Sequence, residues 1–269
     1  MTADARFAKK PLFTRGFERQ WATVRLAVFA LAIAGSLGCG RIAFDPASGS
    51  ADAAIDALDD SRIGVPVCPY LFCNGFEGSA DETPWTSSVE NGGTLGQVTS
   101  PAQSGSFARI NMVATPTGQG FDMATLWSGQ KTGDVFIRAY FYVPTGAVTV
   151  HVDVLAIASN PDLSIPPVHV GIVNSAIGIQ NSVNAMTYLG GTIPRDRWFC
   201  YELHVALSVN ATGAIEQFID GTLDLPIPDV PTVLDVGISH FGAGVLYAQD
   251  PVPVIYTDDV VVSSSRIGC

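Results

Sequence analysis

The chain has 269 residues, of which 27 are Gly, 17 are Pro and only 14% are charged. This length can hold one large domain with appendages. Short runs of Val, Ile and Thr between Gly and Pro favour strands over helices. The formal net charge is −11, although the first 25 residues are basic. The acidic remainder argues against a nucleic-acid partner or an anionic membrane surface.

Residues 1–39 have the organisation of an export signal. A basic segment ends at Arg25, the apolar stretch 26–37 follows, and Gly38 and Cys39 come next. This pattern resembles a bacterial lipoprotein signal, although Ser36 stands where that family usually has Leu. The resemblance implies a lipid on Cys39 and a location in the cell envelope, periplasmic or on the outer surface. The alternatives are an ordinary secretory signal or a short membrane anchor. The apolar stretch 26–37 is short for a membrane-spanning helix, which needs about 20 apolar residues.

Residues 40–65 are rich in Ala, Asp and Ser and contain few large apolar residues. Such a composition cannot bury enough apolar surface to fold, and it predicts a disordered acidic tether. We therefore expect one folded domain over residues 66–269, held away from a membrane that it contacts only through an N-terminal lipid.

Strand patterns fill this domain. We expect strands at 70–77, 94–99, 106–113, 123–128, 135–143, 148–158, 168–173, 198–209, 215–220, 232–241 and 254–263. No segment has a convincing helical period. About ten to twelve strands without helices predict an all-β fold, a β-sandwich of two antiparallel sheets.

The segment 134–143, DVFIRAYFYV, separates its two faces most clearly. One face is apolar, while the other mixes aromatic rings with a guanidinium, which suits a ligand surface better than a core. The same alternation in 148–158 places His151 and Asp153 on one face with Leu155 and Ile157. Polar residues selected in this way are Arg138, Tyr140, Tyr142, His151, Asp153, His169, Glu202 and His204.

Several strings resemble concanavalin-A-like (laminin-G-like) lectin and glucanase jelly rolls. They are WFCYELHV, GAIEQFIDG and IYTDDVVVS in the second half, and FCNGFEGS, Trp85 and SGSFA in the first. Related carbohydrate-binding modules share these short motifs, and the resemblance covers residues 68–269. It implies a jelly roll with one concave sheet that holds a glycan, and a structural calcium ion bound by Glu77 with Asp258 or Asp259. Carboxylate oxygens are ligands that calcium prefers.

We therefore expect a polysaccharide or cell-surface glycan to bind across the eight polar residues without catalysis, since Tyr covers sugar C–H faces and polar side chains bond hydroxyls. The alternatives are a polysaccharide lyase or glycoside hydrolase using the same face, or a structural or adhesion module whose polar faces are only solvated. Lyases of this fold use a Tyr or His pair with Arg or Gln, and those residue types are present. The characteristic strings of alginate lyases are absent, as is the paired carboxylate motif of glucanases.

Four cysteines remain after Cys39 in a chain that we expect to be exported, so disulfides are predicted. A zinc site is the alternative. If the first and last strands pair antiparallel, as the resemblance implies, the expected bridges are Cys68–Cys269 and Cys73–Cys200. The rival pairing is Cys68–Cys73 with Cys200–Cys269.

Overall fold

The computed structural model describes residues 68–78, 83–147, 150–161, 163 and 166–269. The predicted signal (1–39, with Cys39) and the predicted tether (40–65) lie outside the described residues. None of the described residues is helical, so this part of the chain contains no helix that could span a membrane.

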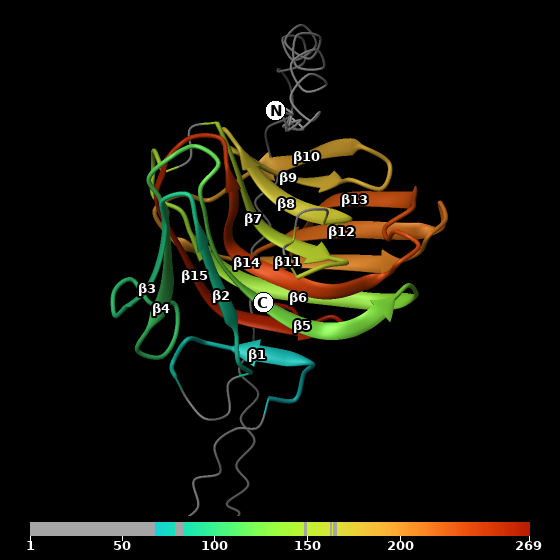
Figure 1. Cartoon of the computed structure of the whole chain (residues 1–269), viewed down its shortest axis with the longest axis horizontal. Helices are drawn as coiled ribbons and strands as arrows, with labels where there is room; N and C mark the ends of the chain where they lie inside the picture. The colour runs from blue at the N-terminus through green and yellow to red at the C-terminus, as the bar shows by residue number, and fades with distance from the viewer. Residues whose placement is uncertain (1–67, 79–82, 148–149, 162, 164–165) are drawn as a thin grey trace, which may run out of the picture. The chain divides into compact units, whose positions relative to one another are not determined.

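Fifteen strands form two antiparallel sheets, which confirms the predicted all-β sandwich (Figure 1). Sheet A has eight strands in the order β13-β12-β11-β6-β15-β4-β3, with β1 paired to β15. Sheet B has seven strands in the order β10-β9-β8-β7-β14-β5-β2. Their bounds are β1 Phe72–Asn74, β2 Thr86–Glu90, β3 Gly93–Val98, β4 Ala108–Val113, β5 Gln119–Gln130, β6 Gly133–Tyr142, β7 His151–Ala158, β8 Val168–Val173, β9 Ala176–Asn181, β10 Met186–Thr192, β11 Trp198–Leu207, β12 Gly213–Ile219, β13 Thr222–Val230, β14 Ile238–Ala248 and β15 Val252–Ser263.

The core lies between the two sheets and follows the alternation of the strands. Ile137 and Phe141 of β6 are fully buried. They share one core cluster with Leu203 of the neighbouring strand β11 and with Ile172 of β8, which belongs to sheet B. Burying a side chain of this size contributes about 1.5–3 kcal/mol each. Arg138 and the other polar residues of β6 therefore face outward from sheet A, as predicted.

One ion pair joins the sheets near their edges. Arg109 on β4 donates to both carboxylate oxygens of Asp122 on β5, each at 2.6 Å, and to Ser87 on β2 at 2.9 Å. Asp122 is 1% exposed. A buried carboxylate without its guanidinium would be strongly destabilising, so this pair fixes how the two sheet edges meet.

Strands β2, β9, β10 and β13 were not predicted, and β14 begins and ends later than expected. Strand β13 contains Pro226 and Pro228, which argue against a central strand, but β13 is the edge strand of sheet A, where a missing N–H is tolerated. Gly242 and Gly244 fall within β14 and hide its continuation to Ala248.

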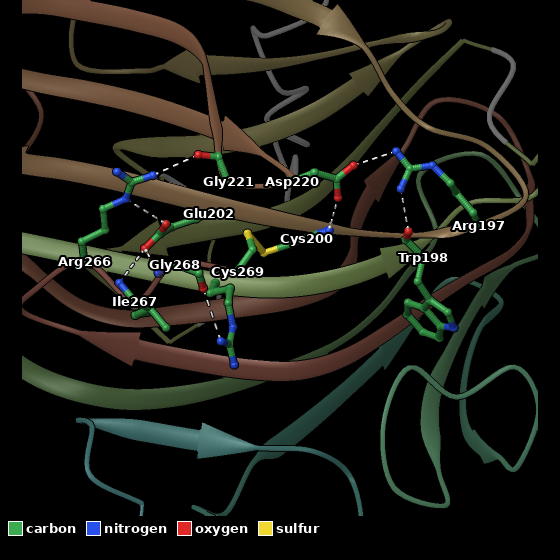
Figure 2. Close-up of a disulfide and its surroundings, with 11 residues drawn as sticks. Arg197, Trp198, Cys200, Glu202, Asp220, Gly221, Arg266, Ile267, Gly268 and Cys269 are labelled. Carbon is green, nitrogen blue, oxygen red and sulfur yellow. Dashed lines mark hydrogen bonds and ion pairs between the residues drawn. A yellow bond between two sulfur atoms is a disulfide. The ribbon is translucent and has the colours of Figure 1, made fainter. Parts of the chain in front are cut away.

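The cysteines pair as Cys68–Cys73 and Cys200–Cys269, so the expected pairing is wrong and its rival is correct. Strand β1 does pair antiparallel with β15, as expected. However, β1 and β6 lie on opposite sides of β15, and the chain after Ser263 turns back towards β11 and β6. Figure 2 shows the result: Cys269 is joined to Cys200 on β11.

Candidate functional site

The eight residues predicted to bind a ligand lie on two different sheets. Five of them face outward from sheet A, on β6 and β11: Arg138, Tyr140, Tyr142, Glu202 and His204. The other three face outward from sheet B, on β7 and β8: His151, Asp153 and His169. Alternation along a strand cannot reveal to which sheet the strand belongs, and the eight residues therefore do not form one surface.

On sheet A, Glu202 is occupied by the C-terminal segment. Its Oε1 accepts hydrogen bonds from the backbone N–H of Ile267 at 2.8 Å and of Gly268 at 3.2 Å (Figure 2). Arg266 lies 3.6 Å from the other carboxylate oxygen, and the Arg138 guanidinium donates to the Gly268 carbonyl. Because Glu202 is fully buried, a ligand on this face cannot reach it in this structure.

His204 on sheet A is also engaged within the protein. Its Nδ1 lies 2.8 Å from Glu216, its Nε2 lies 2.8 Å from Asp134, and its ring stacks on Phe136 at 4.1 Å. The three strands β6, β11 and β12 are joined in this way, which gives His204 a structural role.

The two tyrosines of β6 differ in their contacts. Tyr142 packs edge-on against Trp198 at 5.8 Å and against Tyr256 at 5.7 Å, while Tyr140 lies 5.5 Å from the Arg138 guanidinium. These rings are partly exposed, so they are the members of the sheet A group that remain available to a ligand.

On sheet B, three polar side chains gather around one carboxylate. His151 Nε2 lies 2.8 Å from Asp153 Oδ1, and His169 Nδ1 lies 4.0 Å from Asp153 Oδ2. Tyr247 on β14 stands directly opposite Asp153, with its ring 5.6 Å from the His151 ring. Burial, followed by the charge of Asp153, raises the pKa of Tyr247 above its ordinary value. We call these four residues the Asp153 cluster.

Gly171 makes room for this cluster. It stands opposite Asp153 on β8, and a Cβ at this position would lie 2.8 Å from Asp153 Oδ1 and 2.9 Å from His151 Nε2. The imidazole and the carboxylate therefore lie over the backbone of β8. Any larger residue at position 171 would displace them.

A bulge in β7 determines which residues share the face with the cluster. The register shifts between Asp153 and Leu155, so Leu155 and Ile157 turn into the core. The expectation that both share the face of His151 is wrong for this reason. After the bulge, small residues face outward under Leu163 of the β7–β8 loop.

Leu163 covers part of the outer face of sheet B. A second apolar cluster is buried there, over β5, β14 and the end of β7: Phe121, Ala156, Ala158, Leu163 and Leu246, with Met123 packed against it. The Asp153 cluster lies beside this apolar cover. Strands β8, β9 and β10 continue the face on the other side.

Two residues of this face, Tyr247 and Gln180, were not predicted from the sequence. Tyr247 follows the two glycines at which β14 was expected to have ended. Gln180 lies in the unpredicted β9 directly opposite His169. The alternation of Ile177 and Ile179 with Gly178 and Gln180 was the available signal for that strand.

The predicted calcium ligands hold a loop. Glu77 accepts from the backbone N–H of Ser106 at 2.9 Å and of Phe107 at 3.0 Å, and Asp258 accepts from Gln103 at 2.9 Å. Burial raises the pKa of Asp258 to about 6, against the lowering effect of these hydrogen bonds. Among the described residues, no three His, Cys, Asp or Glu side chains are grouped so as to hold a metal ion.

A calcium ion between Glu77 and Asp258 would therefore need backbone carbonyls of the loop to complete its shell. Asp259, the third predicted ligand, donates its backbone N–H to Asp258 at 2.8 Å. Calcium at this loop stays a prediction.

No family model matches the chain, and no curated protein matches it in sequence. Solved structures share its fold. An endo-β-1,4-glucuronan lyase from the fungus Trichoderma reesei has a TM-score of 0.56 and 18% identity, over 73% of this chain and 96% of the lyase.

Two further solved structures have the same architecture. The cellulose-induced protein Cip1 has a TM-score of 0.55 and 21% identity, over 74% of this chain and 99% of its own. The globular domain of T. cruzi calreticulin has a TM-score of 0.51 and 12% identity, over 73% and 89%. At such identities the similarity shows a shared two-sheet fold, and function must be argued from the site.

Proposed function

We propose that this protein binds polysaccharide on the outer face of sheet B, around the Asp153 cluster. The observation that carries the proposal is the cluster itself: Tyr247, which is 37% exposed, lies beside a carboxylate and two imidazoles that are mostly buried, on the outer face of sheet B. Sugars offer apolar C–H faces for an aromatic ring and hydroxyls for the polar groups.

The alternative surface on sheet A is less suitable, because the C-terminal segment lies over Glu202, which is fully buried, and His204 is held between two carboxylates. One protein with the same fold acts on glucuronan, which supports a carbohydrate ligand for this fold without identifying it.

The direct test is a binding panel. Native affinity electrophoresis with mixed-linkage β-glucan, xylan, galactomannan, alginate and polyglucuronate measures retardation of the protein in each gel. We expect retardation by at least one polymer, and its loss in Asp153→Ala. Asp134→Ala on sheet A is the control and should behave as the wild type. A wild-type protein that no polymer retards would overturn the proposal.

Catalysis by β-elimination is the second candidate, because Tyr247 and the two histidines supply groups that can take and donate a proton. Against it, none of the seven strands of sheet B contains Lys or Arg to neutralise a uronate carboxylate. Gln180 and a protonated imidazole are the groups left for that task. Elimination from alginate or polyglucuronate creates an unsaturated product that absorbs ultraviolet light, and a flat absorbance trace would exclude this candidate.

The predicted location is tested separately. We propose that Cys39 carries a lipid that holds the domain at the cell envelope. Metabolic labelling with a radioactive fatty acid should mark the wild type and leave Cys39→Ser unlabelled. Equal labelling of both proteins would contradict the lipoprotein assignment.

A further inference from the structure

A row of polar side chains leads away from the Asp153 cluster. On the outer face of sheet B, His169 of β8 stands directly opposite Gln180 of β9, and Gln180 stands directly opposite Thr187 of β10. His169 and Gln180 point outward, because their neighbours along each strand are buried, and Thr187 is exposed beside Tyr188, which packs against the core. The row ends at β10, which is the free edge of sheet B (Figure 1).

These three side chains have hydrogen-bonding groups without a partner among the described residues. The Nε2 atom of His169 is buried and has no partner. The side chains of Gln180 and Thr187 make no hydrogen bond to any residue that the structure describes. A buried polar atom without a partner costs free energy, but a ligand would reach His169 Nε2 only after a side-chain movement that exposes it.

A ligand cannot extend in the opposite direction, from His169 towards β7, β14 and β5. On the other side of His169 the same row continues through Ala156 and Gly242 to Met123. Leu163 covers these positions, since a Cβ at Gly242 would lie 2.5 Å from its Cδ1. A long ligand that starts at the Asp153 cluster can therefore extend over β8, β9 and β10 only.

The dimensions suit several sugar units. Neighbouring strands lie about 4.8 Å apart, so the distance from β14 with Tyr247 to β10 with Thr187 is about 19 Å. The charge of the face indicates the chemical class. Sheet B strands carry no Lys or Arg, and Asp153 is the acidic residue of this part of the face. A polyanion would meet a carboxylate with no fixed cation beside it.

We infer that the ligand is an uncharged polysaccharide that lies across the strands, from Tyr247 and Asp153 towards the free edge at β10, and that Gln180 and Thr187 bind sugar units beyond the cluster. This inference rests on the proposed function and adds to it the ligand class, the direction and two specificity-determining residues.

The test uses the full chain and oligosaccharides of increasing length, cut from whichever polymer retards the wild type. Isothermal titration gives a dissociation constant for each length with wild type, Gln180→Ala and Thr187→Val. Loss of one hydrogen bond should weaken binding of long oligomers about fivefold in each variant. The shortest oligomers that bind should show no change, because they occupy the Asp153 cluster alone.

Thr125→Val is the matched control. Thr125 is exposed on the same face of sheet B, but on β5, beyond the apolar cover. Its substitution should leave every dissociation constant unchanged. An equal loss in Thr125→Val and Thr187→Val would refute the direction that we assign.

The outcomes separate this inference from the proposed function. If Asp153→Ala abolishes binding at all lengths while Gln180→Ala and Thr187→Val bind every length as the wild type does, the site stands and the extension is wrong. If alginate or polyglucuronate binds more tightly than every uncharged polymer, the ligand class is wrong. If no polymer binds, the proposed function itself fails.

Discussion

Replacing Gly171 with Ala tests whether the geometry of the Asp153 cluster matters for binding. The new Cβ would lie within 2.9 Å of both Asp153 Oδ1 and His151 Nε2, far closer than van der Waals contact. The backbone of β8 can accept Ala, so the two side chains must move instead. Their hydrogen bond, made by a charged group, contributes about 1.5–3 kcal/mol.

The effect on stability should be small, because replacing Gly within a strand regains about 0.5–1 kcal/mol. The net loss in the free energy of unfolding should therefore stay below about 2.5 kcal/mol. Binding should suffer more clearly: a displaced carboxylate that loses one sugar contact, about 1.4 kcal/mol, weakens affinity about tenfold.

The assay pairs urea unfolding with affinity electrophoresis in the polymer that retards the wild type. Gly96→Ala is the matched control, because its Cβ would meet a single methyl group of Ile110 at 3.1 Å on sheet A. Gly96→Ala should bind as the wild type does. A folded Gly171→Ala protein with wild-type affinity would refute the role that we give to the cluster.

Four further predictions concern the fold and the predicted calcium site. Removing the Cys200–Cys269 bridge, which spans 69 positions, should lower the free energy of unfolding by about 4 kcal/mol, against about 2 kcal/mol for Cys68–Cys73 with its separation of 5. Asp122→Asn should cost about 3 kcal/mol, whereas Arg197→Ala, which breaks an exposed pair, should cost less than about 1 kcal/mol. In EDTA, stability should fall as pH rises from 3.8 to about 6, because folded Asp258 keeps a proton that the unfolded chain has lost. Asp258→Asn should remove that part of the slope. At pH values above 6, added calcium should raise the temperature midpoint of thermal unfolding.

Each of these has a clear contrary result. Non-reducing peptide mapping that finds Cys68 joined to Cys269 would contradict the pairing. Equal costs for Asp122→Asn and Arg197→Ala would show that the ion pair between the sheets is not buried in solution. Identical pH slopes for wild type and Asp258→Asn would show that this carboxyl titrates normally. An unchanged midpoint with calcium would remove the predicted metal site.

The alternation along single strands predicted the sandwich because successive side chains of a strand face the core and the outside in turn. In β6, the apolar side chains of Ile137 and Phe141 face the core, and Arg138 faces outward, as the pattern requires. The alternation fails where a β-bulge interrupts the regular strand. A single bulge after Asp153 turns Leu155 inward, and no local sequence signal marks that position.

The site was harder to predict because it depends on strand order. Arg138 and His169 each stand between apolar residues along the chain, yet their strands belong to different sheets. Tyr247 was missed because glycines before it suggested the end of β14. The burial of Glu202 depends on the C-terminal segment folding back, which only the three-dimensional arrangement reveals.

The most direct test of the central claim compares two tyrosines on the two outer faces. Tyr247 lies in the Asp153 cluster of sheet B, and Tyr142 lies among the partly exposed aromatic rings of sheet A. Affinity electrophoresis in the retarding polymer should show that Tyr247→Ala weakens binding at least about tenfold, a loss of about 1.4 kcal/mol, while Tyr142→Ala leaves it unchanged. Retained binding in Tyr247→Ala, with loss in Tyr142→Ala, would place the ligand on sheet A and contradict the site described above.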